Sequence, residues 1–64
     1  MHNRVAIKDG NFYHIRDLGT GMTVGYIHEN LVSLVPTATG FFGTDANGVG
    51  YVFDSTGCFI RNEF

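Results

Sequence analysis

The stretch TDANGVGYVFDSTG, residues 44–57, places a turn signal on each side of a short run of strand-forming residues. Asn47 and Gly48 form the strongest two-residue hairpin signal in the chain, because both tolerate the positive φ angles of a type I′ turn. The run between the turns is rich in aromatic and β-branched side chains, which favour extended strands. The stretch therefore predicts two consecutive hairpins. Their expected strands are residues 40–44, 49–54 and 58–62.

The rest of the chain shows the same organisation. Nine glycines punctuate it at short intervals, and no stretch of ten or more residues repeats apolar positions at helical spacing. Residues 31–35 remain open between a strand and one helical turn capped by Asn30, and Pro36 would end either. Residues 1–64 are therefore predicted to form a single all-β domain. We expect a small antiparallel meander of five to six strands, curled as an SH3-like barrel or half-barrel. The other expected strands are residues 4–8, 12–17 and 22–28.

Strand register follows from the face that is buried. After Asp9, a three-residue loop pairs Ile7 with Tyr13 and keeps the apolar residues together, whereas a two-residue loop divides them between faces. The following turn then places Tyr13 opposite Tyr26. In the second half, the two-residue loop and a four-residue DSTG loop give an inner face of Phe42, Val49, Tyr51, Phe53, Cys58 and Ile60.

This alternation leaves a second set of apolar side chains on the outer face, and Phe64 ends the chain. Curling of the sheet could turn some of them into a second core. Alternatively, they form an exposed patch that marks a protein interface. The candidate binding residues are Phe12, Arg16, Ile27, Phe41, Phe59 and Arg61.

The length of 64 residues makes the core small. A domain of this size buries only roughly 60 % of its unfolded surface. Such chains often recruit disulfides, a metal or a second subunit. The single cysteine, Cys58, excludes an intrachain disulfide, and the histidines lack the paired spacing of a zinc site. We therefore expect no cofactor or metal, and either a tight core or a homodimer.

Catalytic patterns are also missing from the sequence. Cys58 is expected on the inner face and His14 on the outer face, so they would not form a nucleophile and base pair. The Asp-containing turns lack the ligand register of a calcium loop, and the Gly-Thr-Gly and Gly-Val-Gly fragments lead into no helix that could hold phosphate. We expect the chain not to be an enzyme.

The charged residues are scattered singly and give a net charge of −2. No basic patch is present, which argues against nucleic acid as a partner. No apolar run approaches the roughly 20 residues of a membrane-spanning helix, and the N-terminus lacks a long apolar signal region. Together with the lone thiol, these features lead us to expect a cytoplasmic protein with no membrane contact.

Two family resemblances accompany this reading. GFFG at residues 40–43, beside GYVF at residues 50–53, resembles the aromatic platform of cold-shock domains, which implies single-stranded nucleic-acid binding by base stacking. The basic-aromatic motif of that family is absent. The second half also resembles the aromatic hairpin repeats of choline- and glucan-binding modules, but those use Trp and this chain has none.

A faint internal echo links DGNFYHIRDLGTGM with ANGVGYVFDSTGC. Either any two well-made hairpins look alike, or the chain contains a duplicated hairpin unit. For function, the sequence favours a small non-catalytic module that binds another protein, such as a stoichiometric inhibitor or an adaptor of a larger protein. It would act through its exposed aromatic patch or an open sheet edge. The alternatives are single-stranded nucleic-acid binding and a structural homo-oligomer subunit.

Overall fold

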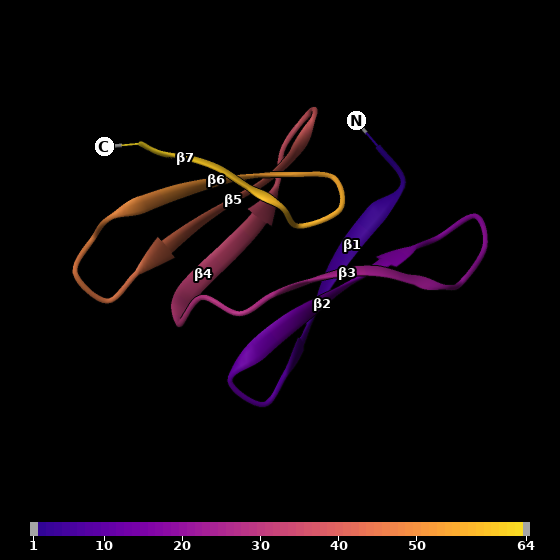
Figure 1. Cartoon of the computed structure of the whole chain (residues 1–64), viewed down its shortest axis with the longest axis horizontal. Coiled ribbons are helices and arrows are strands. Elements are labelled where there is room, and N and C mark those ends of the chain that lie inside the picture. Colours follow the sequence, from indigo (N-terminus) through magenta and orange to yellow (C-terminus); the bar gives the residue numbers. More distant parts are fainter. Residues whose placement is uncertain (1, 64) are drawn as a thin grey trace.

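The computed structural model describes residues 2–63, and this part of the chain contains seven antiparallel strands and no helix (Figure 1). The predicted all-β antiparallel meander is confirmed. Seven strands are present where the sequence predicted five to six, and the ambiguous segment before Pro36 is one of them. The strands are β1 (Arg4–Asp9), β2 (Phe12–Asp17), β3 (Thr23–Ile27), β4 (Leu31–Pro36), β5 (Gly40–Asp45), β6 (Gly50–Asp54) and β7 (Phe59–Glu63).

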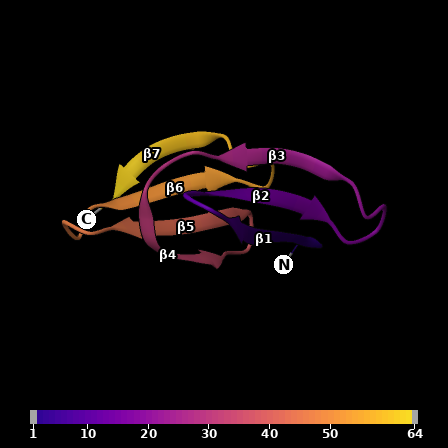
Figure 2. The ribbon, with the colours of Figure 1, turned by 90° about the horizontal axis from the view of Figure 1, so that it is seen from below.

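The strands form two sheets, a first sheet in the order β1-β2-β3 and a second in the order β4-β5-β6-β7. Figure 2 shows β1 near β4 along one side of the molecule, and β3 and β7 along the other. The β1 and β4 strands are in contact, but no strand of residues 2–63 belongs to both sheets. The molecule is therefore a half-barrel and not a closed barrel.

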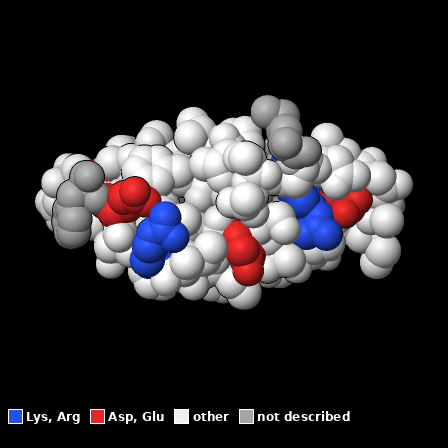
Figure 3. All heavy atoms as spheres, turned by 90° about the horizontal axis from the view of Figure 1, so that it is seen from above, with Lys and Arg blue, Asp and Glu red and all other residues white. Residues whose placement is uncertain are grey.

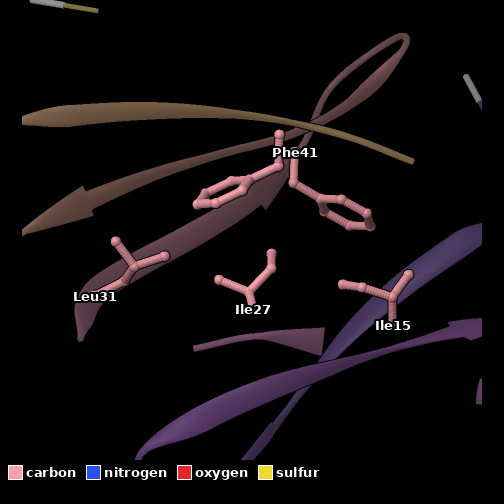
Figure 4. Packing of buried hydrophobic residues seen from close by; sticks show 5 residues of the cluster. Ile15, Ile27, Leu31 and Phe41 are labelled. Carbon is pink, nitrogen blue, oxygen red and sulfur yellow. The ribbon is translucent and has the colours of Figure 1, made fainter. Parts of the chain in front are cut away.

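The core lies between the sheets and consists of five buried side chains (Figure 4). They are Ile15, Ile27, Leu31, Phe41 and Phe53. Two glycines let the sheets approach closely. A Cβ on Gly25 would overlap the carbonyl oxygen of Thr56, and a Cβ on Gly57 would lie 3.1 Å from the Ile15 side chain. The turn between β6 and β7 therefore packs directly on the inner face of the first sheet.

The first hairpin has a two-residue loop, so the predicted three-residue loop is wrong. Asp9 pairs with Phe12 and Ile7 with His14, while Gly10 takes a φ of 67° in the loop. Asp9 continues the strand, so the loop starts one residue later than predicted.

In the next pairing, Tyr13 lies opposite Ile27 and not Tyr26. Because side chains alternate between faces, a one-residue shift exchanges inside and outside. Ile27 is therefore a core residue that is only 1 % exposed, and its predicted place on the outer face is wrong.

The loop between β5 and β6 is longer than predicted, whereas the first loop is shorter. It has three residues, 46–48, and Gly48 has a φ of 83°. Phe41 consequently pairs with Phe53 on the inner face and is 1 % exposed, so its predicted exposure is also wrong. The cause is the Asp45 carboxylate, whose Oδ1 accepts the backbone N–H groups of Asn47 and Val49 at 2.9 and 3.0 Å. These bonds fix the longer loop.

The turn between β6 and β7 repeats this arrangement. Asp54 Oδ1 accepts the backbone N–H groups of Thr56 and Cys58 at 2.8 and 3.0 Å. The loop again has three residues where four were predicted, since the Asp54 N–H donates to the Cys58 carbonyl oxygen. Cys58 is exposed as a result, and its predicted place on the inner face is wrong.

Candidate functional site

The six predicted binding residues do not form one surface. Ile27 and Phe41 lie in the core, so neither is available to a partner. The other four are divided between the sheets. Phe12 and Arg16 lie on the outer face of the first sheet, Phe59 lies at the edge of the second sheet, and Arg61 lies on the outer face of the second sheet.

The first of these surfaces is the outer face of the first sheet, opposite the core. Its members are Val5, Ile7, Asp9, Phe12, His14, Arg16, Tyr26 and His28, and we call them the first-sheet outer face. The Phe12 ring contacts the rings of Tyr26 and His28 at centroid distances of 6.0 and 5.2 Å. Tyr26 is 55 % exposed. Tyr26 and His28 were not predicted on this face, because the expected register placed Tyr26 inside.

His14 is the unusual member of this face. Its Nε2 atom is buried and has no hydrogen-bond partner among the described residues. Its Nδ1 atom is 3.9 Å from Asp9 Oδ2, which is too long for a hydrogen bond. A buried polar atom without a partner costs free energy of folding. The first-sheet outer face therefore contains a polar defect at its centre.

The second surface lies along β7, an edge strand whose described residues are all exposed. Phe59 is 53 % and Ile60 51 % exposed. The Phe59 ring contacts Tyr51 and Phe53 at centroid distances of 6.1 and 6.2 Å. We call Phe59 and Ile60 the β7 rim, since Phe59 extends the aromatic core of the second sheet to the surface.

An open groove of about 460 Å³ occupies the outer face of the second sheet. Phe42 and Val52 form its floor, and Arg61 and Glu63 flank it beside the loop of residues 37–39. Arg61 donates to Glu63 at 3.2 Å, so the predicted binding cation is already paired. The groove therefore offers an apolar floor without a free charge.

Three aspartates anchor the turns that hold these surfaces. Asp17 accepts a hydrogen bond from Arg4 Nε at 2.7 Å, and this bond together with the Gly19 and Thr20 N–H groups lowers the pKa of Asp17 from its ordinary value of 3.8. Arg4 also donates to the Ser55 carbonyl oxygen, so it links the turn after β2 to the turn after β6.

Asp45 and Asp54 follow the same principle. Backbone donation, from Val49 above all, together with the Tyr51 hydroxyl lowers the pKa of Asp45. The hydroxyl and N–H of Thr56 lower the pKa of Asp54. These carboxylates accept the hydrogen bonds that hold their turns, and their role is structural.

His2 also has a structural role, which the sequence did not predict. The Arg4 N–H donates to His2 Nδ1, so the ring proton lies on Nε2, which donates to the Gly40 carbonyl oxygen at 2.8 Å. The ring also packs edge-on against Phe41 at 5.1 Å. His2 therefore ties the start of β1 to β5.

The potential metal ligands of residues 2–63 are not gathered in one cluster. No group of three or more His, Cys, Asp or Glu side chains there could hold a metal ion. Charges are sparse as well, and the face drawn in Figure 3 carries a few charged side chains, several of them beside one of opposite charge, on a mostly uncharged surface. No helix in the described part of the chain is long and apolar enough to cross a membrane.

The chain matches no known protein family, no curated protein and no solved structure. Its candidate sites therefore rest on geometry alone.

Proposed function

We propose that this chain is a non-catalytic module that binds another protein through the β7 rim. The observation that carries the proposal is the exposure of Phe59 and Ile60 on a strand whose outer edge no described strand occupies. Large apolar side chains that remain exposed beside an open edge are typical of surfaces that dock a partner.

The underlying packing supports an anchor role for Phe59. Its ring stands on Tyr51 and Phe53, and the rings of this pair are stacked at 6.3 Å. A side chain supported in this way loses little conformational freedom on binding. Such aromatic residues often supply most of the affinity of an interface.

The edge offers a second contribution. Backbone N–H and C=O groups of an edge strand can pair with an extended segment of a partner. Pairing is favoured at residues 61–63, beyond the irregularity in the β6–β7 register near Phe59. A partner would therefore place an apolar side chain on Phe59 and Ile60, and its backbone along the end of β7.

Site-specific photo-crosslinking in native extracts tests this proposal. A benzoylphenylalanine replaces Ile60 in one variant and Val32, which is 66 % exposed on β4, in a matched control. The variant at position 60 is expected to crosslink one protein, and the control to crosslink none. Addition of Phe59→Ser should abolish the crosslink while the far-ultraviolet circular dichroism spectrum stays unchanged.

Two outcomes would contradict the proposal. One is equal crosslinking at positions 60 and 32, which would indicate non-specific contact. The other is a crosslink from position 60 to nucleic acid, with affinity for a labelled oligonucleotide that falls steeply with salt. That result would support the stacking alternative instead.

A further inference from the structure

The first-sheet outer face carries opposite charges at its two ends. Arg16 is exposed and, among the described residues, has no hydrogen-bond or ion-pair partner. The Asp9 side chain is 66 % exposed, and among the described residues its one basic neighbour within 4 Å is the His14 ring, with Nδ1 at 3.9 Å. Arg16 lies opposite Val5, and Asp9 lies opposite Phe12. The two charges are therefore four positions apart along the sheet, or about 13 Å.

The centre of this face consists mainly of rings, and His14 is a polar member of it. One cross-strand row runs through Ile7, His14 and Tyr26, which are paired in register. The Phe12 ring lies against Tyr26 next to this row. A less polar centre with charged side chains at its rim is the composition of a protein interface.

We propose that a second copy of this chain docks on the first-sheet outer face, so that the protein forms a weak symmetric dimer. The two-fold axis lies in the interface and crosses the strands at the row of Ile7, His14 and Tyr26. This rotation places Arg16 of each copy over Phe12 and one strand away from Asp9 of the other copy. Two identical charge pairs then close the interface, as in an isologous contact.

The charges also select this axis against its alternative. A two-fold axis that runs along β2, parallel to the strands, would place Arg16 over Arg16 and Asp9 over the third strand of the other copy, far from any Arg16. Like charges in an interface cost several kcal/mol. The distribution of Arg16 and Asp9 therefore favours the crossing geometry, in which Tyr26 packs against its own symmetry mate.

The size of the face sets the expected strength. Three strands spaced about 4.8 Å apart, with about six residues of 3.3 Å rise, give a face of roughly 15 by 20 Å. This is well below the about 800 Å² per partner of a standard interface. The dimer should accordingly be weak and form at chain concentrations of about 100 μM or above. The inference does not rest on the β7 rim, which belongs to the other sheet and stays free.

Charge exchange combined with sedimentation equilibrium tests the geometry. Arg16→Glu and Asp9→Lys should each weaken the dimer about tenfold or more, because each places like charges together twice. The double variant R16E/D9K should restore the wild-type affinity. A mixture of the two single variants should form a heterodimer. Arg61→Glu, on the outer face of the second sheet, is the matched control and should leave self-association unchanged.

Tyr26→Ser provides a second variant, since it removes the aromatic contact on the axis without changing charge. It should also shift the protein to monomer while the circular dichroism spectrum is retained. The proposal is overturned if the wild-type chain is monomeric at about 1 mM. Failure of R16E/D9K to recover the dimer, or an equal effect of Arg61→Glu, would overturn it as well. None of these results bears on crosslinking at Ile60.

Discussion

In both three-stranded units of the molecule, β1–β3 and β5–β7, an aspartate ends the central strand and anchors the next turn. Asp17 does so after β2 and Asp54 after β6, and each accepts two backbone N–H groups. A glycine with positive φ completes both turns, Gly21 in one and Gly57 in the other. The third strand of each unit also shows a register irregularity. The sequence similarity between the two units thus corresponds to a shared turn structure.

The two units nevertheless use their faces differently. The β5–β7 unit points its large rings inward, with Phe41 and Phe53 buried. The β1–β3 unit buries only Ile15 and Ile27 and leaves the Phe12, Tyr26 and His28 rings outside. Similar turns therefore do not determine which face a sheet buries. That difference leaves the first unit with the exposed rings on which we propose that a second copy docks.

The largest expected effect tests the register of the second unit. Phe41→Ala should lower the free energy of unfolding by about 3–5 kcal/mol, since it empties a closed core position. Phe42→Ala, on the half-buried outer side, should cost about 1–2 kcal/mol. Urea unfolding of both variants measures the difference. A larger cost for Phe42→Ala would mean that the second unit buries the face opposite to the one that carries Phe41.

The shared aspartate turns predict a common acid sensitivity. The pKa values of Asp17, Asp45 and Asp54 are lowered in the folded chain. Their stabilisation is therefore complete above the unfolded value near 3.8 and is lost as the pH falls through the lower folded pKa values. The urea midpoint should fall steadily below about pH 4. In the triple Asp→Asn variant the urea midpoint should be lower at pH 7 and should depend less on pH. An unchanged fall of the midpoint below about pH 4 in that variant would contradict the role of these aspartates.

The smallest expected effect concerns the polar defect of the first unit. His14→Phe should raise the free energy of unfolding by about 1 kcal/mol, because it removes a buried nitrogen without a partner and keeps a ring of similar size. His28→Phe, at an exposed position of the same face, should change it by less than about 0.5 kcal/mol. Thermal unfolding at low protein concentration separates these effects from dimer formation. Destabilisation by His14→Phe would mean that the ring nitrogen is satisfied.

The fold class and the strand segments could be predicted from the sequence, whereas the registers could not. Each of these errors in loop length amounted to one residue. The loop between β1 and β2 is one residue shorter than predicted, and the loop between β5 and β6 is one residue longer. The sequence contained a signal for the longer loop between β5 and β6, the pattern Asp-x-x-Gly at residues 45–48, which recurs at residues 54–57. An aspartate in the first position accepts N–H groups two and four residues later, which favours a three-residue loop.

The same one-residue shifts explain the candidate site. Phe12 and Arg16 were placed on the correct face because Tyr13 and Ile15, which alternate with them along β2, were correctly predicted to face the core. Ile27 and Phe41 were placed on the wrong face, since each belongs to a strand whose partner was displaced by one. Phe59 and Arg61 are exposed as expected, but on different sides of the second sheet.

By itself, the sequence determined where strands and turns occur, because glycine conformations, aspartate hydrogen bonds and strand preference act over a few neighbouring residues. Only the tertiary structure decided which face of each strand is buried. That choice depends on how the two sheets meet, at Gly25 and Gly57, where the turn after β6 packs on Ile15. Contacts between residues so distant in the chain select one of two alternating faces, whereas the local Asp-x-x-Gly turns fix only the register between neighbouring strands.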